Sequence, residues 1–294
     1  MSIIIQATGI SQPDKNISAI DHAIEAARSC IEAAQVALDD IDLLINVGVY
    51  RDNNLCEPAV AALIQNALGI NLNPVTHPVG RTVLAFDLMN GACGMLNALQ
   101  VASSLLKAKG LKRALLVSGE GHPSKVQSES FPIVHSGAAL LIEKGEGDKG
   151  FKDFVFESSK DFKGQTGVLD LQLYGTQSRS NVQVLRDANY VLELGDFTCD
   201  VVERFLKTHE LDKTDLSLVS SHPDSRFAKD LSEKTGVSLA FGVDKVAQWG
   251  DSHTTALGLG AHFALQDPQG NSKKALLFVG AGSGLTSGCG LYLL

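Results

Sequence analysis

The sequence predicts an α/β fold made of two related halves. Apolar runs of strand length alternate with segments of helical period along the chain. Three sequence blocks of the first half recur in the same order in the second half. The chain has 294 residues, which is long for a single core and suits two fused units. Alternating strands and helices indicate mostly parallel sheets with helices on both faces.

The repeat divides the chain near its middle. The matching blocks are residues 38–47 with 211–220, 66–70 with 233–237, and 112–121 with 273–282. Residues 90–93 and 249–253 take equivalent places before equivalent helices. The polar run 143–153 is the best boundary, so we expect halves spanning residues 1–148 and 149–294. The active site is expected where equivalent helix-start loops meet, at the carboxyl ends of strands.

Each element of the first half follows from its own pattern. Residues 18–38 and 57–68 show apolar side chains at helical spacing, and Gly69 ends the second of these helices. A third helix follows Cys93 and ends near Gly110. Strands are expected at residues 1–6, 41–49, 83–87, 114–118 and 138–142.

Cys93 lies at the turn that begins the third helix. It sits between Ala92 and Gly94 and precedes an apolar-periodic run over residues 95–106. The unpaired N–H groups and the dipole of a helix N-terminus favour negative charge. The thiol is therefore expected to ionise easily and to act as a nucleophile. A buried structural cysteine is the alternative reading.

The second half offers further candidates. His222 follows a strand directly, where such sheets carry catalytic groups, although a surface or helix-capping histidine would look the same. Asp251 and His253 lie at a helix start, where Asp251 could simply be a cap. The glycine-rich residues 279–288 either present N–H groups to an oxyanion or form a tight turn.

Composition excludes several functions. The net charge of −8 argues against a nucleic-acid partner, and no apolar stretch is long enough to span a membrane. The eight histidines and five cysteines lack metal-ligand spacing, so no metal is expected. No glycine motif has the strand–helix context of a dinucleotide site. Free cysteines in odd number and the absence of a signal peptide indicate a cytoplasmic protein.

Together and in this order, the motifs resemble those of the thiolase superfamily, and within it the β-ketoacyl-ACP synthase III group. The resemblance covers nearly the whole chain and implies a five-layered α/β/α/β/α fold and a homodimer, or a heterodimer with a related subunit. It makes Cys93 the acyl-accepting nucleophile and His222 the catalytic histidine. The backbone N–H of Ser283 would join that of Cys93 in an oxyanion hole. The implied substrate is an acyl-CoA or acyl-ACP thioester, with no further cofactor.

Three departures from the family pattern bear on the reaction. Asp251 stands where the family has asparagine, and an ionised carboxylate cannot donate a hydrogen bond to an enolate. It could instead orient His222, as in a Cys–His–acid triad, while His253 could supply the missing donor. The family's coenzyme A-binding segment near the N-terminus is absent. His135 lies in an altered segment before the middle strand and is expected to be structural.

These observations favour an acyltransferase in which Cys93 takes an acyl group and His222, paired with Asp251, activates a second substrate. A decarboxylative carbon–carbon condensing enzyme, of fatty-acid, polyketide or alkylquinolone type, is the nearest alternative. A non-catalytic subunit of a heterodimeric condensing enzyme belongs to a different class. A generic cysteine hydrolase is a weaker third possibility.

Overall fold

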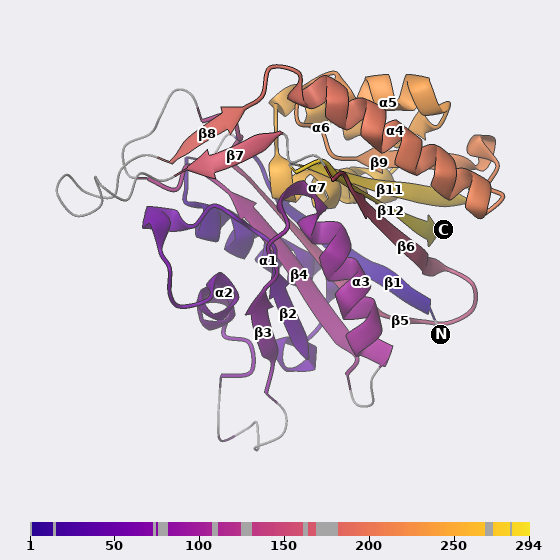
Figure 1. The fold of residues 1–294 in the computed structure, drawn as a ribbon. Helices are drawn as coiled ribbons and strands as arrows, with labels where there is room; N and C mark the ends of the chain where they lie inside the picture. The colour runs from indigo at the N-terminus through magenta and orange to yellow at the C-terminus, as the bar shows by residue number, and fades with distance from the viewer. Residues whose placement is uncertain are drawn as a thin grey trace.

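Two five-stranded mixed sheets with the same strand order form the framework of the protein (Figure 1). The computed structural model describes residues 2–13, 16–72, 75, 82–107, 111–124, 131–160, 164–168, 182–267, 273–282 and 284–294. The first sheet has the order β1-β5-β4-β2-β3, and the second has the order β6-β12-β11-β9-β10. Their strands are β1 (Ser2–Ser11), β2 (Leu43–Asn46), β3 (Leu84–Asp87), β4 (Arg113–Glu120), β5 (Ser136–Gly145), β6 (Gly150–Ser158), β9 (Leu216–Ser220), β10 (Ser238–Leu239), β11 (Ala275–Gly282) and β12 (Thr286–Leu293).

The internal repeat seen in the sequence is present in the structure. Leu43 on β2 pairs in register with Ala114 on β4, and the matching residues Leu216 and Ala275 pair in the same way. The first sheet takes its strands from residues 2–145 and the second from residues 150–293. Equivalent segments therefore occupy equivalent places in the two sheets.

The sheets are mixed, whereas the sequence pattern suggested mostly parallel strands. In each sheet two of the four pairings are parallel, as between β2 and β4, and two are antiparallel, as between β4 and β5. A parallel neighbour requires a crossover of a dozen or more residues. Only residues 283–285 separate β11 from β12, so these two strands have to run antiparallel.

Helices cover both faces of both sheets and produce five layers, as predicted (Figure 1). One pair packs on the outer face of the first sheet, a second pair on the outer face of the second sheet, and a third pair lies between the sheets. These pairs are α1 (Ala19–Ala34) with α2 (Val60–Leu68), α4 (Tyr190–Thr208) with α5 (Phe227–Thr235), and α3 (Gly94–Lys107) with α7 (Ala256–Leu265). The remaining elements are α6 (Val243–Trp249), the hairpin strands β7 (Gln165–Val168) and β8 (Gln183–Arg186), and the short 3₁₀ turns η1 (Leu38–Asp40), η2 (Asp52–Asn54), η3 (Gly91–Cys93), η5 (Lys213–Asp215) and η6 (His253–Thr255).

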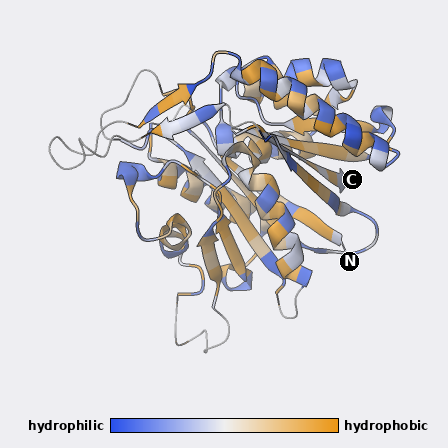
Figure 2. Cartoon of the chain, viewed as in Figure 1, coloured by the Kyte–Doolittle hydropathy of each residue, from blue (hydrophilic) through white to orange (hydrophobic). Residues whose placement is uncertain are grey.

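The central layer is a hydrophobic core shared by the two halves. Neighbouring strand residues face opposite ways, so Leu44 packs on the outer helices and Ile45 on the central ones. Phe278 of the second sheet and Leu99 of α3 belong to the same central cluster. Figure 2 shows the hydrophobic strands inside and hydrophilic outer helix faces. No helix in the described ranges is long and apolar enough to cross a membrane.

The short helix α2 begins at Val60, three residues later than the sequence pattern indicated. The Asp87 carboxylate, from the end of β3, accepts hydrogen bonds from the backbone N–H groups of Val60 and Ala61 at 2.9 and 2.8 Å. The same carboxylate pairs with Arg51 at 2.7 Å and is only 7% exposed. A residue distant in sequence therefore supplies the cap that the helix itself lacks.

Replacing Asp87 with alanine should lower the free energy of unfolding by about 1–3 kcal/mol. The change removes the α2 cap and leaves Arg51 without its carboxylate partner, and the two losses together have a cost of this order. Denaturant unfolding followed by circular dichroism measures the effect. Asp148→Ala, at a fully exposed side chain, is the matched control and should change the midpoint little. Equal stabilities of the two variants would contradict this role for Asp87.

Candidate active site

Two equivalent turns, one from each half, meet at the centre of the molecule. The η3 turn leads into α3 and carries Cys93, and the η6 turn leads into α7 and carries His253. The two turns pack against each other, and η6 also packs against β4. Both helix starts lie between the sheets, and their meeting is the arrangement expected from the repeat.

Cys93 is buried in tight packing. Its side chain is 1% exposed, and its Sγ donates a 3.6 Å hydrogen bond to the Thr286 carbonyl. Gly280 makes room for this residue, because a Cβ there would lie 3.2 Å from the Cys93 Cα. Burial raises the pKa of the Cys93 thiol from 9.0 to about 12. The easily ionised thiol expected from the sequence is therefore not found. The rise in pKa corresponds to ~4 kcal/mol against the thiolate, whereas a helix N-terminus stabilises a negative charge by at most ~2 kcal/mol.

His222 follows β9 directly and is held as a neutral base. Its Nδ1 lies 3.3 Å from the Ser220 carbonyl and its Nε2 lies 2.6 Å from the Ser252 hydroxyl. A carbonyl can only accept, so we assign the proton to Nδ1, and Nε2 then accepts a hydrogen bond from the Ser252 hydroxyl. Burial lowers the pKa of His222 to about 4. The ring is thus uncharged at neutral pH.

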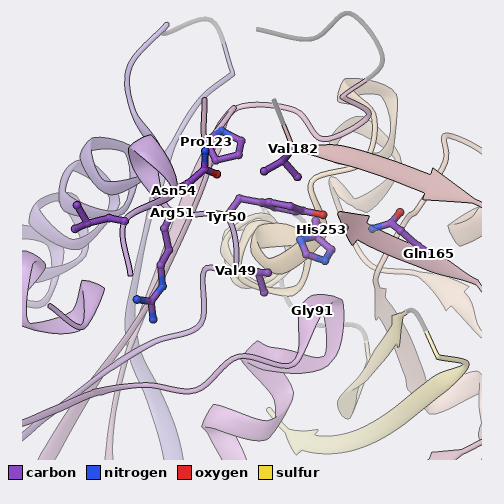
Figure 3. Close-up of a pocket in the computed structure, with 11 residues that line it drawn as sticks. Val49, Tyr50, Arg51, Asn54, Gly91, Pro123, Gln165, Val182 and His253 are labelled. Carbon is purple, nitrogen blue, oxygen red and sulfur yellow. The ribbon is translucent and has the colours of Figure 1, made fainter. Parts of the chain in front are cut away.

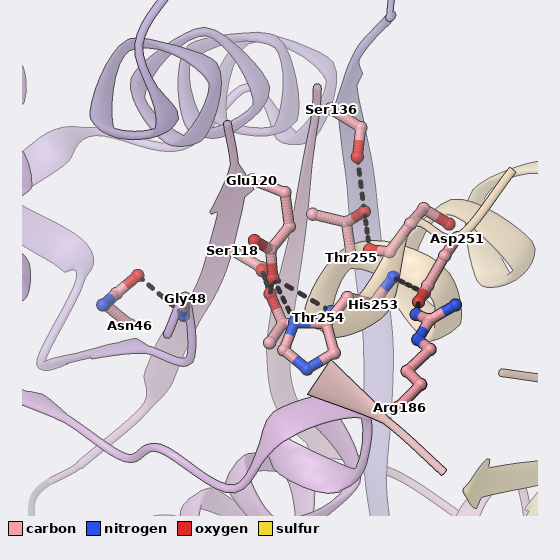
Figure 4. A network of polar contacts seen from close by, with 11 residues as sticks. Asn46, Gly48, Ser118, Glu120, Ser136, Arg186, Asp251, His253, Thr254 and Thr255 are labelled. Atoms are coloured by element: carbon pink, nitrogen blue, oxygen red, sulfur yellow. Dashed lines mark hydrogen bonds and ion pairs between the residues drawn. The ribbon is translucent and has the colours of Figure 1, made fainter. Parts of the chain in front are cut away.

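Asp251 is engaged by partners other than the predicted His222. It forms a close ion pair with Arg186, and its Oδ1 accepts a 2.9 Å hydrogen bond from the backbone N–H of His253 (Figure 4). Burial raises the pKa of Asp251, while His253 and Arg186 oppose that shift. The direct His222–Asp251 hydrogen bond expected from the sequence does not form, because Ser252 occupies Nε2 and the Arg186 cation attracts the carboxylate more strongly than a neutral ring does.

His253 makes its own pair with a carboxylate, Glu120 at the end of β4 (Figure 4). Its Nδ1 lies 2.8 Å from Oε1 of Glu120. The same oxygen accepts from the Thr254 backbone N–H at 3.2 Å and from the Thr254 hydroxyl at 2.5 Å. Burial works to lower the pKa of His253, but the adjacent Glu120 carboxylate raises it overall.

Glu120 and Arg186 were missed by the sequence reasoning. Glu120 does carry a local signal, since it is a charged residue at the carboxyl end of a buried strand, where such folds place functional groups. Arg186 lies on the β7–β8 strand pair, which has no counterpart among the described residues of the first half, so the repeat offered no guide to it.

Two neighbouring cavities adjoin these groups. The inner one, about 10 Å³, has the volume of a single water and lies between Ala92, His222 and Asp251. The outer one is about 390 Å³ (Figure 3). Its lining is Val49, Tyr50, Arg51, Asn54, Leu55, Gly91, Pro123, Gln165, Gly167, Val182 and His253. Gln165 and His253 line both cavities.

The structure therefore brings three of the candidates, His222, Asp251 and His253, to one small cavity, with Cys93 in the adjoining turn. Ser283 lies outside the described residues. His135 lines neither cavity; it accepts from the His122 backbone N–H at 3.3 Å. No cluster of three or more potential metal ligands occurs in the described part of the chain.

Comparison with known proteins points to one family. No protein-family model matches the chain. It is 28% identical to the β-ketoacyl-ACP synthase III of Thiobacillus denitrificans over 301 residues, covering 98% of this chain and 89% of that protein. It is 26% identical to that of Wolbachia pipientis over 311 residues, covering 97% and 88%.

Solved structures agree on the fold. The priming β-ketosynthase of the R1128 polyketide pathway superposes with a TM-score of 0.81 at 17% identity, covering all of this chain and 96% of the other. The 3-oxoacyl-ACP synthase III of Aquifex aeolicus superposes with a TM-score of 0.77 at 15% identity, covering both chains fully. The chain therefore has the thiolase-like fold and is a relative of the β-ketoacyl-ACP synthase III condensing enzymes.

Proposed function

We propose that the protein is an acyltransferase that takes an acyl group from an acyl-CoA or acyl-ACP thioester onto Cys93 and passes it to a second substrate. The observation that carries this proposal is the meeting of the Cys93 turn with the His253 turn beside His222. The relatives named β-ketoacyl-ACP synthase III support the choice of thioester donor.

The first step needs a proton acceptor because the resting thiol is neutral. As the sulfur attacks the thioester carbonyl, the thiol proton passes to a base and then to the departing CoA or ACP sulfur. His222 suits this role, since its ring is uncharged and its Nε2 lone pair faces a hydroxyl rather than a cation. Asp251 acts on the site through the Arg186 ion pair and the backbone of His253. Ser283 and Cys93 are proposed to supply the oxyanion hole.

Hydrogen-bond donors distinguish acyl transfer from decarboxylative condensation. Condensation forms a thioester enolate that needs donors aimed at its oxygen. Asp251 offers no donor when ionised, and Nε2 of His222 accepts a hydrogen bond from Ser252 instead of donating one. Both features favour transfer to a preformed nucleophile.

Incubation with octanoyl-CoA or acetyl-CoA should add one acyl group to the peptide that contains Cys93, because the thioester exchanges its CoA sulfur for the sulfur of Cys93. Mass spectrometry of the intact protein and of its peptides measures the adduct. The Cys93→Ala variant should show none. The Cys56→Ala variant, which lacks the exposed cysteine, is the matched control and should load as the parent does. An absent adduct, or equal labelling of parent and Cys93→Ala, would overturn the proposal.

The names of the relatives favour a second candidate, carbon–carbon condensation. Because neither Asp251 nor His222 offers a hydrogen bond to an enolate, the octanoylated protein should release no carbon dioxide from malonyl-CoA or malonyl-ACP above the rate of the Cys93→Ala variant. Trapping of ¹⁴CO₂ from carboxyl-labelled malonyl thioester provides the measurement. Release that depends on Cys93 would establish condensation in place of simple acyl transfer.

The burial of both Cys93 and His222 supports one further candidate, a non-catalytic subunit of a heterodimeric condensing enzyme. Size-exclusion chromatography of the protein alone, and together with the products of neighbouring genes, separates that assembly from a homodimer. An acyl adduct on the isolated chain would exclude the non-catalytic role.

A further inference from the structure

We propose that His253, oriented by Glu120, is the general base that removes the proton of the acceptor when the acyl group leaves Cys93. This inference rests on the acyltransferase function proposed above. It assigns the second step to a different histidine from the first and identifies the class of acceptor.

The free nitrogen of His253 points into the space where an acceptor would bind. Glu120 fixes the proton on Nδ1, so Nε2 carries the lone pair of the neutral ring. Within the described ranges, Nε2 has no hydrogen-bond partner. It faces the Cys93 turn, because a Cβ added at Gly91 would lie 3.2 Å from it. The ring lines both cavities and lies beside Tyr50, with 5.7 Å between ring centroids (Figure 3).

The backbone is strained at the position that aims this ring. His253 has φ of 44°, in the left-handed region that costs a non-glycine residue on the order of 1–3 kcal/mol. Asp251 accepts from the His253 N–H, and Glu120 accepts from both Thr254 groups, so the surroundings hold the strained turn in place. Opposite the ring, Gly91 has φ of 49° and no side chain to block Nε2.

Other titratable groups of the site are already engaged. Nε2 of His222 accepts a hydrogen bond from the Ser252 hydroxyl and is assigned to the loading step, and Asp251 is paired with Arg186. The charged or titratable groups around His253 are Glu120 from β4, Asp251 from the loop before η6, Arg186 from β8, and Tyr50 from the loop after β2. Among them the Glu120 carboxylate is in direct contact with the ring, and it stabilises the imidazolium that forms when the ring takes a proton.

The transfer step needs only the acceptor, the acyl-Cys93 thioester and His253. The acceptor's oxygen or nitrogen attacks the carbonyl carbon of the acyl-Cys93 thioester while its proton moves to Nε2 of His253. The tetrahedral intermediate then breaks the carbon–sulfur bond and releases the Cys93 thiolate. The proton on Nε2 passes to that sulfur, which restores the thiol and the neutral ring. The product is an ester or an amide, according to the acceptor.

The outer cavity indicates an uncharged acceptor. Its polar contributors include the Tyr50 hydroxyl and the side-chain amides of Asn54 and Gln165, set among aliphatic side chains. The one guanidinium in the described lining, that of Arg51, is neutralised by Asp87 at 2.7 Å. A charged acceptor would find no unpaired counter-charge among these residues. We therefore assign the site to a small alcohol or to an amine too weakly basic to be charged at neutral pH, such as an aromatic amine.

The test separates loading from transfer. The parent and the His253→Gln, Glu120→Gln and His262→Gln variants are first loaded with octanoyl-CoA and freed of excess donor. Deacylation is then followed by intact-protein mass spectrometry in water alone and with benzyl alcohol as the probe. His262 is the matched control: its Nδ1 lies 2.8 Å from Thr8, and it lines neither cavity. Loading of each variant also reports that it is folded.

His253→Gln should load normally but transfer 10²- to 10⁴-fold more slowly, about the contribution of a general base. His262→Gln should match the parent in both steps. In the parent, the transfer rate should rise with pH as His253 loses its proton. Glu120→Gln removes the charge that favours the imidazolium. The rise of the transfer rate with pH should therefore occur at lower pH, and the maximal transfer rate should fall.

Transfer by His253→Gln at the parent's rate would overturn this inference, as would parent deacylation no faster than that of an octanoylated Cys93 peptide. An unshifted pH profile for Glu120→Gln would contradict the positioning role of Glu120. Failure of the parent to load on Cys93 would instead overturn the proposed function, so the two failures can be told apart.

Discussion

A single buried carboxylate oxygen joins the two halves of the site. Oε1 of Glu120, from the last residue of β4, accepts hydrogen bonds from His253 and from two groups of Thr254. Glu120 is fully buried, so these bonds act in a medium where an unpaired carboxylate would be costly. These bonds hold the turn before α7 against the first sheet and fix the orientation of the His253 ring.

The two histidines of the site have different surroundings, and these set the charge of each ring. The imidazole of His222 is held neutral by burial and accepts a hydrogen bond from the Ser252 hydroxyl. The imidazole of His253 is held beside a carboxylate, which favours its charged form. Two groups of the same type thus acquire opposite protonation tendencies from their surroundings, which is how enzyme sites divide the tasks of acid and base. The close pairing of Asp251 with Arg186 keeps that carboxylate away from the first ring.

Much of the fold could be predicted from the sequence because its signals are local. Strand and helix periods, and blocks such as residues 112–121 and 273–282, repeat in an order that requires two equivalent sheets. The position of Cys93 at a helix start and of His222 after a strand followed from the same patterns. The two antiparallel pairings in each sheet were not foreseen, since alternation of strands and helices does not reveal direction at the sheet's far edge.

The site was less predictable because its contacts join distant residues. Asp87 caps α2 by accepting from Ala61, Glu120 binds His253, and Arg186 pairs with Asp251. In each of these contacts the two residues lie at least 26 positions apart in the sequence. The thiol's raised pKa likewise depends on packing by Gly280 and Thr286, which no local pattern at Cys93 discloses. Sequence motifs therefore located the residues, while tertiary contacts decided their partners and charges.

The division of roles between the two histidines is the central claim, and ¹⁵N NMR of histidine-labelled protein tests it most directly. Assigned with His222→Gln and His253→Gln variants, the ring nitrogens should show His222 as the neutral Nδ1–H form down to about pH 5. His253 should take up its proton at a higher pH than an exposed histidine does. A His222 ring that becomes charged before His253 as the pH falls would contradict the account.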